Sequence, residues 1–147
     1  MPKNKLEAYI TDPNAYAAFK QHNKGDAGYD LVSVGQADIS PSVTTLLSTG
    51  VYVAIPEGYV GLVTLRSSMC KRFFIPNAPG IIDSGYRGCI YVPVVALGEN
   101  VEIVKPGERI AQLVIVPTVD FSVTLVDRAV DLGSTERGDG AFGSTGV

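Results

Sequence analysis

The sequence predicts an all-β domain, built as a sandwich, a barrel or a jelly roll, with at most a short helix. Two observations lead to this prediction. Short apolar stretches rich in Val, Ile and Thr recur at a spacing of about 8–12 residues, with turn residues between them. Glycine and proline are also frequent, at 16 and 9 of 147 residues, which favours many turns over long helices.

The elements can be placed in order along the chain. Residues 6–10 are expected to form a short strand, and residues 14–20 a helical turn or two that begins near Asp12 or Asn14. From Leu31 onward we expect strands that are separated by turns, several of them buried on both faces because polar and apolar residues alternate poorly. These strands cover residues 43–55, 59–65, 89–97, 101–104, 109–116 and 121–126, and turns are expected at 56–58, 79–80, 98–100 and 106–107.

Composition excludes several classes of protein. Hydrophobic residues make up 46% of the chain and charged residues 18%, so the chain is not disordered, and its length suits one domain. The formal net charge is -3 and no run of Lys or Arg occurs, so we expect no nucleic-acid polymer as a partner, although a single nucleotide stays possible. One histidine and two cysteines are too few for a zinc site or a disulfide framework. Cys70 and Cys89 are therefore expected to be packing residues, and His22 a surface residue.

Location and domain organisation follow from the same composition. No apolar stretch reaches the roughly 20 residues that span a bilayer, and the N-terminus lacks the apolar segment of a signal peptide, so no membrane partner is expected. With so few cysteines, the expected location is cytoplasmic. Small and polar residues dominate the end of the chain. We therefore expect a β-domain over residues 1–133 and a flexible, Gly-rich C-terminal arm over residues 134–147.

Two segments in the first half carry side chains that are unusual for plain β-structure. Residues 25–31 (Gly-Asp-Ala-Gly-Tyr-Asp-Leu) place a carboxylate beside glycine at the start of a strand, although a capped turn would explain the same pattern. Residues 66–68 (Arg-Ser-Ser) follow an apolar run directly. A guanidinium group with hydroxyl groups at a strand end suits phosphate binding, and a surface strand end is the alternative.

Three further segments lie in the second half. Residues 77–88 contain a Pro-Gly turn, two isoleucines and then Asp83, which we expect to be partly buried and which is a candidate base; a turn that begins at Asp83 is the alternative. In residues 106–113, Gln112 interrupts an apolar strand and needs a hydrogen-bond partner if it is buried. Residues 137–146 combine Arg, Phe and hydroxyl groups with glycines whose amides could hold a phosphate chain, unless this segment is merely a disordered tail.

These five segments, in this order and spacing, resemble the trimeric dUTPase family from about Ala27 to Gly146. The resemblance implies a jelly-roll or β-barrel-like fold and an enzyme that hydrolyses dUTP to dUMP and pyrophosphate. It also implies Mg²⁺ as cofactor and a homotrimer whose three sites lie between subunits. Phosphate-anhydride hydrolysis needs charge neutralisation and a positioned water rather than a covalent nucleophile, which agrees with this composition.

The resemblance also assigns roles to individual residues. Asp83 would be the base that orients and deprotonates the attacking water, and Tyr86 would pack under the deoxyribose and exclude a 2'-hydroxyl. The remaining residues would bind the substrate or the metal. Asn77 through Gly80 would read the uracil edge, with Ile82 beside them, and Phe142 would stack on the uracil. The phosphates would be held by Arg66, Ser67, Ser68 and Gln112, and Asp30 would position Mg²⁺ through water. The terminal phosphate would be covered by Arg137, Gly143, Ser144 and Thr145.

Three positions depart from the family pattern. Ser68 stands where glycine is usual, Gly85 where a second acid is common, and Ala141 where the arm usually has glycine. Arg-Ser-Ser also resembles the related dCTP deaminases, which use a glutamate in the strand after the third motif. That place falls near Pro93, and residues 89–98 contain no acid, so the dUTPase prediction is preferred.

A different class of function stays open from the sequence. A nucleotide-gated regulatory protein or a purely structural jelly roll could use the same scaffold, because a fold does not decide a function. The intact set of Asp30, Asp83, Tyr86 and Arg137 argues against an inactive relative.

Overall fold

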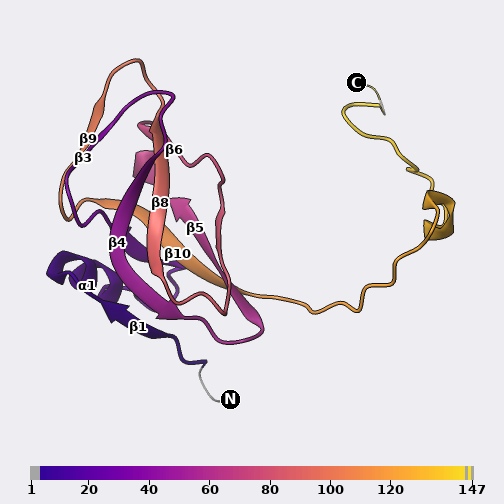
Figure 1. Cartoon of the computed structure of the whole chain (residues 1–147), viewed down its shortest axis with the longest axis horizontal. Coiled ribbons are helices and arrows are strands. Elements are labelled where there is room, and N and C mark those ends of the chain that lie inside the picture. Colours follow the sequence, from indigo (N-terminus) through magenta and orange to yellow (C-terminus); the bar gives the residue numbers. More distant parts are fainter. Residues whose placement is uncertain (1–3, 145, 147) are drawn as a thin grey trace.

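A computed structural model describes residues 4–144 and residue 146 (Figure 1). Most of the regular structure is β-strand, with one α-helix and two short 3-10 helices. In chain order the elements are β1 (Glu7–Ile10), α1 (Pro13–Lys20), β2 (Gly28–Val32), β3 (Ala37–Ile39), β4 (Thr45–Ala54), β5 (Tyr59–Leu65), η1 (Ser67–Met69), β6 (Phe73–Phe74), β7 (Gly80–Ile82), β8 (Cys89–Ala96), β9 (Glu102–Val104), β10 (Arg109–Pro117) and η2 (Ala129–Leu132).

The strands form two antiparallel four-stranded sheets and a small ribbon. One sheet has the order β1-β4-β8-β6, the other has the order β2-β10-β5-β7, and β3 pairs with β9. The predicted all-β fold with one short helix is confirmed, and neither sheet closes into a barrel. The non-consecutive neighbours in both sheets bring segments that are distant in sequence to the same sheet edge.

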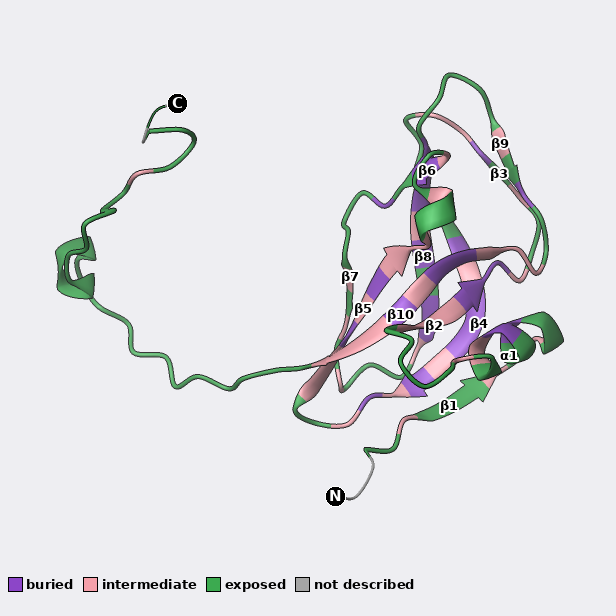
Figure 2. Cartoon of the chain, turned by 180° about the vertical axis from the view of Figure 1, so that it is seen from behind, coloured by how far each residue is buried: buried purple, intermediate pink, exposed green. Residues whose placement is uncertain are grey.

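The hydrophobic core lies between the two larger sheets, where purple buried segments of both sheets are visible in Figure 2. Leu31 and Leu113 of one sheet and Ile90 and Val92 of the other are fully buried. Because side chains alternate along a strand, the neighbours of these core residues in β2 and β10 point to the outer face of the sheet. That outer face carries the polar residues discussed below.

Helix α1 begins where the sequence predicted. Asp12 caps it, since its Oδ1 accepts hydrogen bonds from the backbone amides of Asn14 (2.9 Å) and Ala15 (3.0 Å). Ala15 and Ala18 are buried against the sheets, so the small side chains of the helix allow close packing. Among the residues that the structure describes, no helix is long and apolar enough to cross a membrane.

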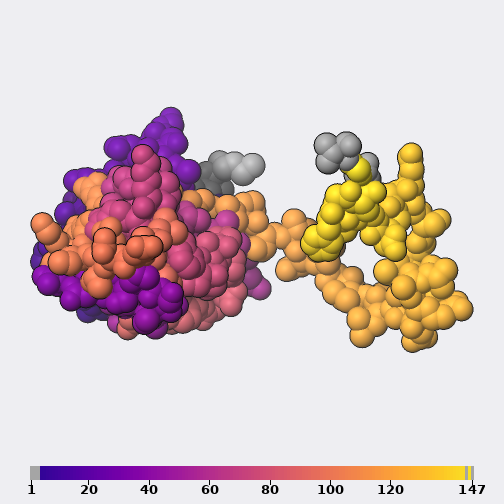
Figure 3. Space-filling model, turned by 90° about the horizontal axis from the view of Figure 1, so that it is seen from above, coloured from indigo at the N-terminus to yellow at the C-terminus, as the bar shows by residue number. Residues whose placement is uncertain are grey.

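The strand that we predicted over residues 121–126 is not formed. After β10 the chain leaves the sheets and continues as an extended segment that stands apart from the folded body (Figures 1 and 3). Its apolar side chains alternate as in a strand but are exposed: Val119, Phe121, Val123 and Leu125 are each at least 73% exposed. The sequence pattern of a strand is therefore present, but no strand within residues 4–144 pairs with it.

Candidate active site

The residues expected to recognise the nucleoside gather in one cavity beside edge strand β7. The cavity has a volume of ≈ 300 Å³, and its lining includes Asn77, Gly80, Ile82, Asp83 and Tyr86. Strand β7 pairs with β5 through Gly80 opposite Val63 and Ile82 opposite Gly61. Because β7 has a neighbour on only one side, its other edge keeps free backbone groups that can pair with a base.

Asp83 follows β7 directly and begins a turn. The backbone amide of Tyr86 donates to the Asp83 carbonyl at 3.1 Å, so the predicted Asp-initiated turn is present as well as the cavity. The prediction that Asp83 would be partly buried is wrong, because its side chain is exposed. Among the described residues of one chain, no segment covers this carboxylate.

Tyr86 is held in place at the mouth of this cavity. Its hydroxyl group donates to the Cys89 carbonyl at 2.8 Å, which pulls the ring over Gly88. A Cβ atom at Gly88 would collide with the ring and the hydroxyl of Tyr86, so only glycine permits this placement. The fixed ring leaves 41% of Tyr86 exposed.

Part of the lining was not predicted from the sequence. Leu46 of β4 and Tyr91 of β8 also line the cavity, and they are 63% and 48% exposed. Tyr91 stands between the buried residues Ile90 and Val92, so strand alternation was the available signal for its outward position. Leu46 and Tyr91 give this cavity a partly apolar wall, as an aromatic base requires.

The residues expected to hold phosphates lie in a second cavity, on the outer face of the other sheet edge. Its volume is ≈ 370 Å³, and its lining includes Asp30, Arg66, Ser67 and Gln112. Asp30 lies on β2, Gln112 on β10 and Arg66 just after β5, so three neighbouring strands supply the site. Gln112 and Asp30 are paired in the strand register, which places both on the same face.

Asp30 joins two guanidinium groups in this cavity. Its Oδ1 lies 3.2 Å from Arg66 Nε, and its Oδ2 accepts a hydrogen bond of 3.0 Å from Arg109 NH1. Arg109 also donates to Gln21. Arg109 is a site residue that was not predicted, although it lies in the same segment as Gln112. Its position at the start of a strand, three residues before Gln112, is the sequence feature that could have indicated it.

Gln112 is packed closely against strand β2. A Cβ atom at Gly28 would lie 2.5 Å from Gln112 Oε1, so glycine at this position leaves space for the amide group. Gln112 is half-buried and lines the cavity, which matches its expected role as a polar contact inside an apolar strand. Gly28 of the first motif thus leaves the space that the side chain of Gln112, in the fourth motif, occupies.

The prediction that His22 is a surface residue is wrong. His22 is half-buried and stacks on Tyr29, with ring centroids 4.0 Å apart, and it lines the same cavity as Asp30. His22 Nδ1 lies 3.0 Å from the Gly28 carbonyl, so this nitrogen carries the proton. The stacking partner Tyr29 sits in the first motif, seven residues after His22 in the sequence.

The turn after Arg66 is a short 3-10 helix, η1. Ser67 lines the phosphate cavity, whereas Ser68 is exposed and is not part of its lining. Cys70 is exposed and its thiol donates to the Ser67 carbonyl at 3.0 Å, so the expectation of a packing role is wrong for Cys70. Cys89 is buried, as expected of a packing residue.

The described part of the C-terminal arm stands apart from the folded body (Figure 3), and none of its residues lines either cavity. Its hydrogen bonds are local: Arg137 Nε donates to the Gly140 carbonyl at 3.1 Å, and the Ser144 amide donates to the Ala141 carbonyl at 3.0 Å. Phe142 is fully exposed, and Gly143 has a positive φ of 82°. Thr145 lies outside the described residues.

Within one chain, the predicted site residues therefore lie in three separate places: the nucleoside cavity, the phosphate cavity and the C-terminal arm. The nucleoside cavity lies beside edge strand β7, and the phosphate cavity lies over β2, β10 and the end of β5. Ile82, the residue before Asp83, pairs with Gly61, and Arg66 lies five residues further along β5, which separates these positions by about 17 Å at about 3.3 Å per residue. Within the part of the chain that the structure describes, no group of three or more His, Cys, Asp or Glu side chains is arranged to hold a metal ion.

The antiparallel two-sheet fold, with a partly apolar cavity beside β7 and a charged cavity around Asp30, suits the class of nucleotide-binding proteins. Comparisons with known proteins make the assignment specific. The family model described as dUTPase matches residues 14–146. The chain belongs to the dUTPase family and is an enzyme of that family.

Individual relatives agree with this assignment. The deoxyuridine 5'-triphosphate nucleotidohydrolase of Cutibacterium acnes is 47% identical, over 84% of this chain and 81% of its own length. That of Clostridium kluyveri is 42% identical, over 85% and 87%. Among solved structures, a G164S mutant of the Staphylococcus bacteriophage 80alpha dUTPase with dUpNHpp has a TM-score of 0.78 and 31% identity, and covers 99% of this chain and 100% of its own.

Proposed function

We propose that this chain hydrolyses dUTP to dUMP and pyrophosphate in a Mg²⁺-dependent reaction, with Asp83 as the base that activates water. The observation that carries the proposal is the meeting of Asn77, Gly80, Asp83 and Tyr86 in one cavity. These residues supply a base-pairing edge, a sugar-packing ring and a carboxylate within one space.

Recognition of the nucleoside rests on strand β7 and Tyr86. The free edge of β7 offers backbone donors and acceptors to uracil, and unpaired buried polar groups would reject a base with the wrong pattern. Tyr86, fixed by its hydrogen bond to Cys89, would lie under the deoxyribose and occupy the space of a 2'-hydroxyl group. Ile82 would add apolar contact to the base.

The phosphate chain would bind in the cavity of Arg66, Ser67 and Gln112. Arginine is suited to phosphate because its planar group donates two parallel hydrogen bonds. Ser68 would contribute through its position in η1. This cavity brings positive charge to the leaving pyrophosphate, as phosphoryl transfer requires.

The residues present fit a magnesium ion that is held mainly by phosphate and water. Both oxygens of Asp30 already accept contacts from arginine, so a bound water, rather than the ion itself, is the fitting partner for this carboxylate. Such an ion would neutralise charge on the phosphates when it is bound. A dUTPase from phage phi11 of S. aureus is described as coordinating a structural Mg(II) ion.

We further propose that the active enzyme is a homotrimer. Asp83 follows Ile82, which pairs with Gly61 near the start of β5, whereas Arg66 follows the end of β5, so Asp83 and Arg66 of the same chain are poorly placed to act on one molecule of dUTP. Sites shared between chains would remove this separation. The exposed alternating side chains from Val119 to Leu125 also require a cover, and a neighbouring chain would supply it.

The arm would complete the site from another chain. Arg137, Gly143, Ser144 and Thr145 would close over the terminal phosphate, and Phe142 would stack on uracil. The exposure of Phe142 in the isolated chain supports this role, since an aromatic ring without a contact gains most from such stacking. We take residues 134–147 as the arm that closes the site.

The lining of the nucleoside cavity also favours dUTP hydrolysis over deamination. Pro93, which occupies the approximate place of the deaminase glutamate, lines this cavity and cannot transfer a proton. We propose no nucleic-acid polymer and no membrane as partners, and a cytoplasmic location.

A panel of nucleotides tests the proposed activity. Pure protein is incubated with Mg²⁺ and, separately, dUTP, UTP, dCTP and dTTP, and both pyrophosphate and ammonia are measured. Pyrophosphate from dUTP alone is the expected result. Ammonia from dCTP would identify a deaminase, and no product from any nucleotide would identify a binding protein. Light scattering of the same sample is expected to give the mass of three chains.

A further inference from the structure

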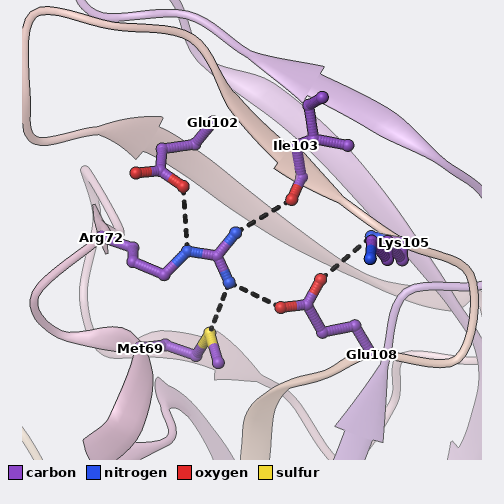
Figure 4. A network of polar contacts seen from close by, with 6 residues as sticks. All are labelled: Met69, Arg72, Glu102, Ile103, Lys105 and Glu108. Carbon is purple, nitrogen blue, oxygen red and sulfur yellow. Dashed lines mark hydrogen bonds and ion pairs between the residues drawn. The ribbon is translucent and has the colours of Figure 1, made fainter.

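Arg72 lies outside the predicted site residues, yet its side chain connects three segments of the fold (Figure 4). Its Nε donates to Glu102 Oε2 at 3.0 Å and its NH2 to the Ile103 carbonyl at 2.9 Å, both on β9. Its NH1 donates to Glu108 Oε1 at 2.5 Å and lies 3.8 Å from Met69 Sδ. Each nitrogen of the guanidinium group therefore has a partner.

One of these connections leads to Arg66. The backbone amide of Arg72 donates to the Met69 carbonyl, and the amide of Met69 donates to the Arg66 carbonyl, each at 2.9 Å. The amide of Arg66 in turn donates to the Ile110 carbonyl at 3.1 Å. Through side chain and backbone, Arg72 thus holds the turn that begins at Arg66 and contains Ser67.

The other connection leads to Arg109. Glu108 binds Arg72 with one oxygen and accepts from the Lys105 amide at 2.9 Å with the other. Its own carbonyl accepts from the amide of buried Ser33 at 3.0 Å. Glu108 is thereby fixed from three directions, and the next residue is Arg109, whose side chain reaches Asp30.

The hydrogen bonds in this network stabilise the charged forms of both Arg72 and Glu108. Burial lowers the pKa of Arg72, but the hydrogen bonds to Glu108 and Glu102 outweigh it and raise that pKa overall. Burial raises the pKa of Glu108, but the hydrogen bonds from the Lys105 amide and from Arg72 outweigh it and lower that pKa overall. Both shifts favour the charged forms, so the ion pair between Arg72 and Glu108 is expected at neutral pH.

We propose that Arg72 is a positioning residue for the phosphate cavity: through Met69 and Glu108 it fixes the two arginines, Arg66 and Arg109, that flank Asp30. A guanidinium group is needed because only a planar fork reaches Glu102, Glu108 and the Ile103 carbonyl together. The inference rests on the proposed function, in which this cavity holds the phosphate chain. It assigns Arg72 no contact with substrate.

The test compares binding at the two ends of the substrate. In Arg72→Lys the charge remains and the fork is lost, while Glu108→Gln keeps the shape and loses the charge. For both variants we expect the Kd of inorganic pyrophosphate with Mg²⁺, measured by calorimetry, to rise about five-fold or more, and the KM for dUTP to rise in parallel. The inhibition constant of deoxyuridine, which has no phosphate, is expected to stay within about two-fold of the wild-type value.

A merely structural role would give a different pattern. It would lower the melting temperature and kcat through loss of active protein, and would leave the pyrophosphate Kd and the KM unchanged. That pattern, in either variant, overturns the proposal. Lys71→Met is the matched control, because Lys71 is the exposed neighbour of Arg72, and it is expected to change neither constant.

The two proposals fail in different ways. If the wild-type enzyme releases no pyrophosphate from dUTP, the proposed function is wrong, and the calorimetric comparison still measures what Arg72 does for the cavity. If dUTP is hydrolysed and both variants bind pyrophosphate as the wild type does, only the role of Arg72 is wrong. Should Arg72→Lys fail to fold, Glu108→Gln decides the question.

Discussion

Asp30 and Arg109 meet across the neighbouring strands β2 and β10, where Asp30 Oδ2 accepts a hydrogen bond of 3.0 Å from Arg109 NH1. Arg109 stands opposite Val32 in the strand register, so its side chain reaches back along β2 to Asp30. The register shifts between Arg109 and Ala111, and this irregularity releases the arginine from the regular pleat. The Asp30 carboxylate thereby holds the Arg109 guanidinium group in the phosphate cavity, a position that the regular strand geometry would not give it.

Loss of Arg109 is therefore expected to weaken the phosphate cavity. Arg109→Met removes a hydrogen bond between charged groups, worth about 1.5–3 kcal/mol, so kcat/KM for dUTP should fall about ten-fold or more. Steady-state release of pyrophosphate measures this. Lys5→Met is the control, since exposed Lys5 pairs only with nearby Glu7; an equal loss in both variants would contradict the role of Arg109.

Asp83→Asn tests the base. The amide keeps the size of the side chain and cannot take a proton, so kcat should fall about 10²–10⁴-fold. Binding of a non-hydrolysable dUTP analogue and the melting temperature should stay near wild-type values, because Asp83 is exposed and its turn is made by backbone atoms. Normal turnover in this variant would remove Asp83 as the base.

Gly88→Ala tests the sugar-packing role of Tyr86. The added Cβ would displace the ring and its hydroxyl, so the variant should discriminate less between dUTP and UTP, by about ten-fold in the ratio of kcat/KM. Gly85→Ala is a matched control in the same turn, because a Cβ there meets nothing within 4 Å. Unchanged discrimination in Gly88→Ala would show that the ring position does not select the sugar.

Deletion of residues 134–147 tests the arm. Activity should fall about 100-fold or more, because a site left open to water loses both phosphate contacts and the stacked Phe142. The number of chains in the assembly, measured by light scattering, should not change. Full activity in the shortened protein would mean that the arm has no part in the reaction.

Acid should weaken the contribution of Glu108 to stability. Its pKa is lowered in the folded state, so the unfolded state binds more protons as the pH falls, and stability rises with pH in that range. The contribution is complete above the ordinary glutamate pKa of about 4.3 and is lost below it. In urea unfolding at one protein concentration, Glu108→Gln should be less stable than wild type at about pH 7, with a smaller difference at about pH 3.5.

Glu99→Gln provides the comparison for that experiment, since Glu99 is exposed. It should follow the wild-type curve at both pH values. A difference between wild type and Glu108→Gln that is the same at both values would contradict the linkage.

Local patterns determined much of this protein. Turn residues and apolar stretches placed most strands to within a few residues, and Asp12 marked the start of α1 because a cap is a local interaction. The resemblance to the dUTPase family implied that Asn77, Gly80, Asp83 and Tyr86 act together, and these residues, which lie close in sequence, do share a cavity. Such features depend on neighbours in the chain, so the sequence records them directly.

Tertiary structure decided what depends on distant neighbours. Residues 121–126 have a strand pattern and form no strand, because pairing needs a second strand and the described part of the chain places none beside them. His22 is half-buried only because Tyr29 folds against it, and Arg109 belongs to the phosphate cavity only because β2 lies beside β10. The sequence by itself determined the strands, the cap and the chemistry of the motifs. Strand pairing alone placed Asp83 beside the start of β5 and Arg66 beyond its end, because pairing between strands depends on contacts that no local pattern encodes.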